Sequence, residues 1–371
     1  MIAIVYPQFY GVGGIARYLD SFLLNMPENH PKIYLITGDE YRVARTYNDV
    51  EIIHIPFTIS RFNLFVWGWK ARQLLRKLFD EGRIKVINLH FPPMIPGLLL
   101  HRDIPVILTV HSTYLGMAGK FYPEKYYTSE IGWVPLKIKM WMESNLYKNS
   151  IKAITLTEFG RQQMLAYGFN KPVRIIPNGV DLKQFEVNLH QGKDIDIIFS
   201  GRIELLKGSK KMIEVCRQLV AIKKDIVIYI VGYGVEENCV REQLADLSKN
   251  VVMTGKVAFS EMMSYYNRSR IYVSTSYYEG LPGTCLEATA MGLPTVAWDF
   301  LFYRGLVIPN KTGYLIEPND TYAMAQKITE ILTDTDKLNA LASNTRGHME
   351  AHYNWQDLSK QILQVLNGEK V

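Results

Sequence analysis

Cysteine is scarce in this chain: Cys216, Cys239 and Cys285 are the only three among 371 residues. Three widely spaced cysteines cannot form a fully paired framework, which excludes the small disulfide-stabilised folds of secreted proteins. The sequence contains no CxxC motif and no cluster of cysteine with histidine, so it offers no structural zinc site. We expect three reduced thiols that behave as small apolar side chains.

Long apolar runs are also missing. No segment approaches the roughly 20 consecutive apolar residues that a membrane-spanning helix needs. The first residues, Met1–Val5, have the pattern of a buried strand. No basic segment precedes them and no long apolar segment follows, which is not the pattern of a signal peptide. We therefore expect a cytoplasmic protein.

The charge lacks balance between the two halves. The net charge is +6, of which residues 1–185 carry +8 and residues 186–371 carry −2. Segment 60–79 combines aromatic residues with five basic residues in a helical pattern. Such a helix either lies on the inner face of an anionic membrane, as a peripheral contact, or packs on a sheet with its cations in water. Both interpretations stay open, and we expect no nucleic-acid partner.

Strand and helix patterns alternate along the chain, which indicates an α/β fold with parallel sheets covered by helices. The length suits two domains, and the polar, turn-rich stretch 177–193 suits a break between them. We assign residues 1–187 to the first domain and 188–352 to the second. The expected strands are 2–6, 32–37, 50–55, 86–89, 106–110, 153–157, 173–176, 196–200, 226–231, 251–254, 271–274, 294–297 and 313–316.

The clearest chemical pattern lies in Tyr277–Glu287. This segment follows an expected strand, passes through a turn rich in glycine and proline, and opens a helix at Thr284. Backbone N–H groups at such a helix start favour an anion. Glu279 and Glu287 could each accept two hydrogen bonds from sugar hydroxyls. Alternatively, they are an ordinary loop acid and an ordinary acid near a helix N-terminus.

A second pattern lies in Phe199–Gly208, also between an expected strand and a helix. In open α/β sheets, ligands bind in the crevice at the carboxyl ends of the strands. Arg202 and Lys207 would present two cations there, and a diphosphate needs such charges. The plain alternative is two solvated basic residues around a turn.

Together the two segments resemble the donor half of the retaining glycosyltransferases of family 4, which have the GT-B fold. That family has a Gly-Arg followed by a Lys-Gly, and two glutamates eight positions apart; here these are Gly201-Arg202, Lys207-Gly208, Glu279 and Glu287. Weaker matches extend over nearly the whole chain, at Gly13–Tyr18, Thr109–Ser112, Ile154–Glu158 and Ile176–Asp181.

The resemblance implies two Rossmann-like domains that face each other across a cleft. It also implies that the C-terminal helix, within residues 353–371, crosses back to the first domain. Arg202 and Lys207 would bind the donor diphosphate and stabilise its departure. Glu279 would face the transferred sugar, and Glu287 would hold the ribose hydroxyls.

Further residues of the site follow from the same resemblance. His111 would lie near the reacting sugar; without the resemblance, it would be an ordinary strand-end histidine with its hydrogen bonds satisfied. Gly13 and Gly14 would leave room for phosphate or acceptor. The remaining donor contacts would come from Gly201, Gly280, Leu281, Pro282, Gly283 and Thr284.

The implied reaction moves a hexose from a UDP- or GDP-sugar to a sugar, lipid or small-molecule acceptor, with attack on the face that the diphosphate leaves. We expect no cofactor and no metal. Asp194–Asp196 and Asp334–Asp336 match the Asp-x-Asp of metal-dependent glycosyltransferases. However, the first enters a strand and the second precedes a helix, where aspartate commonly caps.

Two alternatives remain. Gly11–Ala16 fits a loose dinucleotide fingerprint, with Asp39 or Glu40 as the ribose acid, which would suit an NAD(P)-dependent oxidoreductase. The second alternative is a non-catalytic subunit with the same fold that binds a sugar nucleotide. Segment Trp298–Gly305 departs from the family, since relatives often have small residues there, and this leaves the identity of the donor open.

Overall fold

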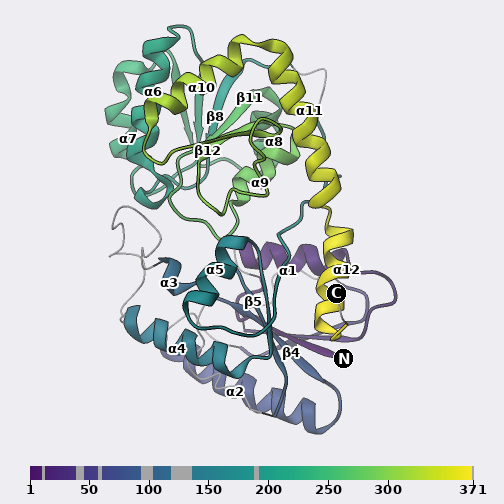
Figure 1. Cartoon of the computed structure of the whole chain (residues 1–371). Helices are drawn as coiled ribbons and strands as arrows, with labels where there is room; N and C mark the ends of the chain where they lie inside the picture. The colour runs from purple at the N-terminus through teal and green to yellow at the C-terminus, as the bar shows by residue number, and fades with distance from the viewer. Residues whose placement is uncertain are drawn as a thin grey trace. The chain divides into compact units, whose positions relative to one another are not determined.

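The computed structural model describes residues 1–10, 13–38, 46–56, 61–92, 103–117, 136–187 and 192–369, without the side chains of residues 61–63. The chain divides into two compact units, coloured by residue number in Figure 1. Met1–Gly179 and Trp355–Val371 form the first unit, and Val180–Asn354 forms the second.

The division at residue 180 precedes the expected break at 187, because the intervening segment is bonded to the second unit. The Val180 N–H donates to the Tyr353 carbonyl at 2.8 Å. The Phe185 carbonyl accepts a hydrogen bond from Arg346 Nη1, also at 2.8 Å.

The first unit is built on a parallel sheet with the strand order β3-β2-β1-β4-β5-β6-β7. Both faces of such a sheet are covered by helices, so its interior strands are mostly apolar. The interior strand β1, for example, is buried at all four positions. The strands are β1 (Ile2–Val5), β2 (Ile33–Thr37), β3 (Val50–His54), β4 (Val86–Phe91), β5 (Val106–Val110), β6 (Lys152–Thr155) and β7 (Val173–Ile175).

Helices cover this sheet on its two faces. They are α1 (Gly14–Leu24), α2 (Arg61–Asp80), α3 (Tyr114–Met117), α4 (Leu136–Asn149), α5 (Glu158–Ala166) and α12 (Trp355–Leu366). Trp67 of α2, Tyr147 of α4 and Met164 of α5 belong to one buried cluster, so these three helices share a face of the sheet.

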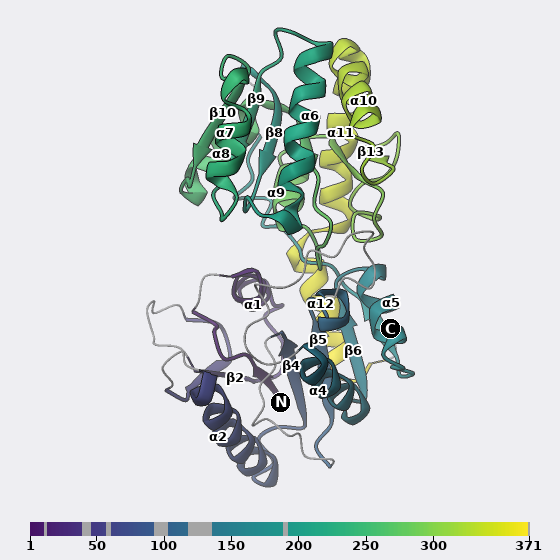
Figure 2. The ribbon, with the colours of Figure 1, turned by 90° about the vertical axis from the view of Figure 1, so that its left-hand side faces the viewer.

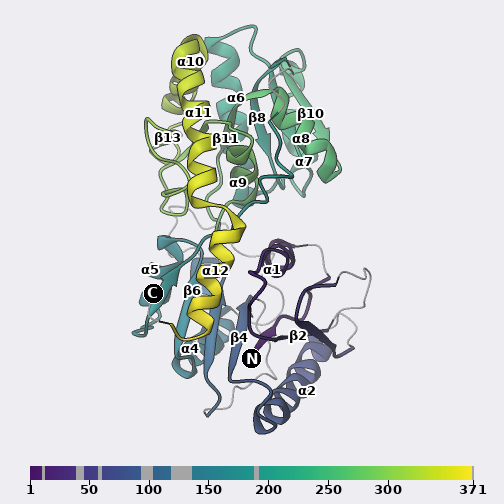
Figure 3. The same ribbon diagram turned by 90° about the vertical axis from the view of Figure 1, so that its right-hand side faces the viewer.

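The C-terminal helix α12 packs in the first unit, as the family resemblance implies. Its Ser359 hydroxyl donates to the Phe22 carbonyl of α1 at 3.4 Å. The rings of Trp355 and Tyr18 lie 5.1 Å apart between centroids. Figure 3 follows α12, in yellow, into this unit.

The second unit has a parallel sheet with the order β10-β9-β8-β11-β12-β13, seen in Figure 2. The strands are β8 (Ile195–Ser200), β9 (Ile228–Val231), β10 (Val251–Gly255), β11 (Ser269–Ser274), β12 (Thr295–Trp298) and β13 (Gly313–Ile316). The helices are η1 (Leu205–Lys207), α6 (Ser209–Ile222), α7 (Glu237–Gln243), η2 (Ala245–Leu247), α8 (Phe259–Arg268), α9 (Gly283–Ala290), α10 (Thr321–Thr333) and α11 (Thr335–His352).

Both sheets have the doubly wound order of Rossmann-like domains, which confirms the predicted fold class. The order reverses between β1 and β4 in the first unit and between β8 and β11 in the second. Ligands of such sheets bind at these reversal points, beyond the carboxyl ends of the strands. None of the described helices combines the length and the apolar composition that a membrane span requires.

Candidate functional site

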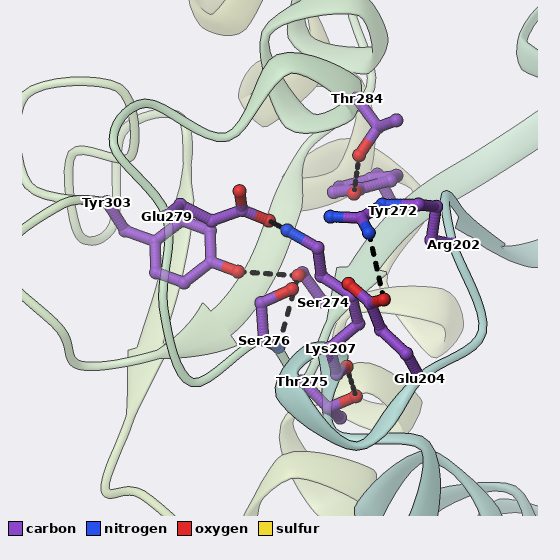
Figure 4. Close-up of polar contacts among 10 residues, drawn as sticks. All are labelled: Arg202, Glu204, Lys207, Tyr272, Ser274, Thr275, Ser276, Glu279, Thr284 and Tyr303. Atoms are coloured by element: carbon purple, nitrogen blue, oxygen red, sulfur yellow. Dashed lines mark hydrogen bonds and ion pairs between the residues drawn. The ribbon is translucent and has the colours of Figure 1, made fainter. Parts of the chain in front are cut away.

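Most of the predicted site residues lie at the reversal point of the second sheet. β8 ends at Ser200 and leads into Gly201 and Arg202, while the adjacent β11 ends at Ser274 and leads into the loop that carries Glu279. The two chemical patterns of the sequence, about 80 residues apart, therefore meet at one edge of the sheet (Figure 4).

Gly208 brings the two loops together. Its φ of +72° lies in the left-handed region, and a Cβ there would lie 2.0 Å from the Thr275 carbonyl oxygen. The Thr275 hydroxyl donates to the carbonyls of Lys207 and Gly208 at 3.2 and 3.1 Å. Only glycine allows this approach, and it places Lys207 beside the loop that follows β11.

Lys207 and Glu279 form an ion pair across the two loops. Lys207 Nζ lies 2.5 Å from Glu279 Oε1, and the side chains are only 20% and 17% exposed. Figure 4 shows them pointing toward each other. A pair so shielded from water interacts more strongly than a surface pair.

Arg202 is paired as well. Its Nη1 donates to Glu204 Oε2 at 2.9 Å, and Glu204 is buried while Arg202 is mostly exposed. The sequence analysis did not predict Glu204; its place two residues after the arginine was the only signal. Both cationic side chains that are predicted to bind the diphosphate, Arg202 and Lys207, are thus held in place by a carboxylate.

Helix α9 begins at this edge without a side-chain cap. Its N-cap residue, Pro282, has no N–H, and the next backbone N–H groups are those of Gly283 and Thr284. The Thr284 hydroxyl is 2.9 Å from the Tyr272 hydroxyl, which fixes its side chain. Of the preceding loop, Gly280 and Leu281 are partly exposed and Pro282 is buried.

Glu287 lies one turn further along α9, next to a buried phenol that the sequence analysis missed. The Tyr266 hydroxyl lies 3.4 Å from Glu287 Oε2 and 2.9 Å from Ser200 Oγ. Burial, and then the charge of Glu287, raise the pKa of Tyr266 well above its usual value. The phenol therefore stays protonated and can donate to the carboxylate.

The bulky segment that begins at the last residue of β12 supports the Glu279 loop from the core. Trp298, Phe302 and Tyr303 are fully buried. Trp298 Nε1 donates to the Thr275 carbonyl at 3.0 Å, and the Tyr303 hydroxyl lies 2.5 Å from Ser274 Oγ. The large side chains that distinguish this segment from the family pattern therefore pack beneath the site.

The other three predicted residues belong to the first unit. His111 directly follows β5, and its Nε2 lies 3.1 Å from Nδ1 of His90. Burial lowers the pKa of His111 to about 3, so the ring is neutral at physiological pH.

Gly13 and Gly14 lie at the start of α1. A Cβ at either position would have no described atom within 4 Å, so internal packing does not require glycine there. Gly11, Val12, Asp39 and Glu40, which carry most of the dinucleotide fingerprint, lie outside the described residues.

The two Asp-x-Asp segments have structural roles. Asp194 pairs with Arg268 at 2.7 Å, and Asp196 Oδ2 accepts from the Val227 N–H at 3.0 Å. Asp334 caps α11 by accepting from the Lys337 N–H at 2.9 Å. Within the described ranges, no group of three or more His, Cys, Asp or Glu side chains could hold a metal ion.

Two family patterns together cover most of the sequence. Residues 12–184 match Glycosyltransferase Family 4, and residues 180–348 match Glycosyl transferases group 1.

Individual relatives are distant. A GDP-mannose-dependent monoacylated alpha-(1-6)-phosphatidylinositol monomannoside mannosyltransferase of Corynebacterium glutamicum is 26% identical over 223 residues, which are 55% of this chain and 58% of that protein. The capsular polysaccharide biosynthesis glycosyltransferase CapM of Staphylococcus aureus is 22% identical over 229 residues, 60% of each chain. The chain thus spans less than two thirds of the length of these relatives.

Solved structures match over nearly the full length. A sucrose-phosphate synthase from Thermosynechococcus elongatus superposes with a TM-score of 0.80 at 20% identity, covering 99% of this chain and 98% of that one. Alr3699/HepE from Anabaena, in complex with UDP and glucose, has a TM-score of 0.73 at 15% identity and covers 99% of both chains. At these identities the likeness concerns the fold.

Proposed function

Because the chain belongs to glycosyltransferase family 4 and has its GT-B fold, we propose that it transfers a hexose from a nucleoside-diphosphate sugar to an acceptor hydroxyl. The observation that carries this proposal is the pairing of Lys207 with Glu279 beside the uncapped start of α9, at the reversal point of the second sheet. There a cation, a helix dipole and a carboxylate are available to a ligand that combines a diphosphate with a polyol.

The diphosphate would bind between the two cations and α9. Arg202 and Lys207 would neutralise its charge, and the N–H groups of Gly283 and Thr284 would donate to its oxygens. Because two side-chain cations supply this charge, we propose that the reaction requires no metal ion. Full activity in a chelator is the expected result.

Glu287 would accept hydrogen bonds from the two ribose hydroxyls. The Tyr266 phenol, which stays protonated, would hold this carboxylate in position. Ribose is common to UDP and GDP, so this contact does not select between them. One relative is named for GDP-mannose and one similar structure contains UDP, so both bases are candidates.

The sugar would lie against Glu279, and the reaction would retain the anomeric configuration. The bond between the anomeric carbon and the diphosphate breaks while the acceptor oxygen bonds to the same face of that carbon. The acceptor proton passes to the departing phosphate oxygen. Arg202 and Lys207 would stabilise the charge that develops on this leaving group. Retention is tested by the configuration of the product glycoside in a proton NMR spectrum.

The first unit also has features that suit a lipid-linked acceptor at an anionic membrane. Phe65 and Trp69 on α2 and Trp141 on α4 are 51%, 50% and 68% exposed, and Lys70 and Lys137 beside them are exposed too. The two helices cover the same face of the sheet. Aromatic side chains next to cations are typical of peripheral membrane contacts.

Vesicle flotation tests this contact. We expect the protein to float with vesicles that contain phosphatidylglycerol and to stay behind with neutral ones. The double change Trp69→Ser with Trp141→Ser should abolish flotation, whereas Tyr322→Ser, an exposed aromatic of the second unit, should not. Equal flotation of both variants would count against a membrane contact at α2 and α4.

A thermal-shift panel tests the donor assignment. UDP, GDP, ADP and NAD are added in a chelator to the wild type and to Glu287→Ala. A ligand that binds only the native state raises the melting temperature by mass action. We expect a shift with UDP or GDP that the variant loses; a shift with NAD alone, or with none of the four ligands, would contradict the donor assignment.

A further inference from the structure

In the first unit, hydrogen bonds connect three polar side chains in series: Asn88 and His90 of β4, and His111, which follows β5. Asn88 and His90 occupy alternate positions of β4, so both side chains stand on the same face of the sheet. Asn88 is fully buried, His90 is 1% exposed and His111 is 8% exposed. His111 is therefore the most exposed of the three side chains.

The orientation of the Asn88 amide is fixed by a backbone carbonyl. One amide atom lies 3.2 Å from the Ile107 carbonyl oxygen and 2.9 Å from Thr109 Oγ1. A carbonyl oxygen only accepts hydrogen bonds, so the atom facing it is the nitrogen, Nδ2. The other amide atom, Oδ1, therefore faces His90 and acts as an acceptor.

The hydrogen positions on both histidines follow from this orientation. Nε2 of His90 lies 2.8 Å from Asn88 Oδ1, so it must carry a hydrogen. Burial, and then the nearby His111, keep the pKa of His90 well below its usual value. The ring is neutral, and its Nδ1 is an unprotonated acceptor that lies 3.1 Å from His111 Nε2. That nitrogen of His111 must then carry the hydrogen.

We infer that Asn88 and His90 are positioning residues that hold His111 in one tautomer, with the hydrogen on Nε2 and a free lone pair on Nδ1. Among the described residues, none forms a hydrogen bond with His111 Nδ1. An unprotonated nitrogen accepts a hydrogen bond from a hydroxyl and repels a phosphate oxygen. His111 is thereby set to bind a sugar hydroxyl and to reject a phosphate group.

The identity of the ligand, a sugar hydroxyl, rests on the proposed function. The tautomer of His111 does not, because it follows from the hydrogen bonds alone. NMR of the full-length protein labelled with ¹⁵N-histidine reads the two ring nitrogens separately, without any substrate. The signals of His111 are identified by their absence in His111→Asn. We expect an unprotonated Nδ1 and a protonated Nε2 throughout the neutral pH range. A protonated Nδ1 would overturn the inference.

A matched pair of variants tests the role of His90. His90→Phe keeps an aromatic ring but removes the acceptor, so His111 should exchange between its two tautomers and kcat/KM for transfer should fall about tenfold. Tyr18→Phe is the control, because the Tyr18 ring lies 4.8 Å from that of His111 but its buried hydroxyl has no partner among the described residues. It should leave the His111 signals unchanged.

The outcomes separate this inference from the proposed function. An unchanged His111 tautomer in His90→Phe would contradict it, and if that variant fails to fold, the wild-type spectrum alone decides. A protein with the expected tautomer but no transferase activity would refute the proposed function and leave the tautomer assignment in place. An active transferase with a hydrogen on Nδ1 would refute only the assignment.

Discussion

At the scale of single residues, the candidate site contains two carboxylates that are each paired with a cation. Glu279 pairs with Lys207 and Glu204 pairs with Arg202 before any ligand arrives. Donors held in advance do not have to reorganise as charge develops on a leaving group, which is the main source of electrostatic catalysis. Lys207 is the better shielded of the two cations, so its charge acts through a lower effective dielectric constant.

A second residue-scale feature is the buried carboxyl of Glu143 in α4. Its oxygens accept hydrogen bonds from the Tyr147 hydroxyl at 2.7 Å, from the Tyr114 N–H at 3.0 Å and from the Tyr167 hydroxyl. Burial nevertheless dominates and raises the pKa of Glu143 from 4.5 to about 7.

The Glu143 pKa predicts a pH dependence of stability. Because the folded pKa lies above the unfolded value, the folded state binds the proton more tightly. The resulting stabilisation is complete below about pH 4.5 and is lost as the pH rises through about 7. Glu143→Gln, which does not titrate, should lack this component. Urea unfolding of both proteins across that range measures the difference, and parallel pH profiles would contradict the assignment.

At the scale of elements, two glycines at helix starts differ in what a side chain would do. Packing requires glycine at position 208, whereas it leaves room for a side chain at position 283. Gly208→Ala should destabilise the fold, because φ is +72° and the new Cβ would lie 2.0 Å from the Thr275 carbonyl oxygen. The left-handed conformation alone costs about 1–2 kcal/mol for a residue with a side chain. Gly283→Ala meets no described atom within 4 Å, so its unfolding free energy should change by less than about 1 kcal/mol.

The two variants should therefore separate stability from binding. A Cβ points toward the N-terminus of its helix, so the methyl group of Gly283→Ala would lie where we place the diphosphate. Nucleotide affinity should fall in this variant while its urea midpoint stays near that of the wild type. Loss of stability in Gly283→Ala, or an unaffected Gly208→Ala, would contradict this account of α9 and α6.

The strands were predictable from sequence because strands of a parallel sheet are apolar on both faces. Each of the thirteen expected segments contains or overlaps one of β1–β13. Helix α4 was not predicted, since its buried face is narrow: it buries only Glu143 and Tyr147. The buried face of α11 is also narrow, with only Leu341, Thr345 and Met349, so the capping aspartate Asp334 was the only signal for that helix. Such sparse patterns resemble polar loops until the neighbouring elements are known.

The residues of the candidate site could be predicted only where they belong to a short sequence motif. The positions of Arg202, Lys207, Glu279 and Glu287 came from short motifs and their order along the chain. No short motif indicated the roles of Glu204, Tyr266, Asn88 and His90, because these roles depend on contacts between elements. For Asn88 and His90, two polar residues at alternate positions of a buried strand were a signal that sequence analysis could have used.

At the scale of the whole molecule, the chain contributes its last helix to the unit that contains its first strand. The buried face of α12 consists of Trp355, Leu358, Ser359, Ile362, Leu363, Val365 and Leu366. This face closes the core beside α1, so residues at the two ends of the sequence stabilise the same unit.

Because α12 belongs to the first unit, a destabilising substitution in this helix should affect the first unit and leave the second unchanged. Ile362→Ala removes a large part of a buried side chain and should cost about 2–5 kcal/mol. Hydrogen exchange should then speed up in β1 and β4 of the first unit, while β8 and β11 of the second unit keep the wild-type rates. Faster exchange in both units, or in the second alone, would contradict the division of the chain.

In the proposed function, Lys207 binds the diphosphate of a nucleotide sugar in the second unit. Lys211 provides a matched control, since it pairs with Glu214 at 2.8 Å and is 22% exposed, against 20% for Lys207. We would titrate UDP and GDP calorimetrically, in a chelator, into the wild type, Lys207→Ala and Lys211→Ala. We expect one nucleotide to bind the wild type and Lys211→Ala equally, and to bind Lys207→Ala about tenfold to a hundredfold more weakly. Equal binding by Lys207→Ala and the wild type, or binding by none of the three proteins, would contradict this role of Lys207.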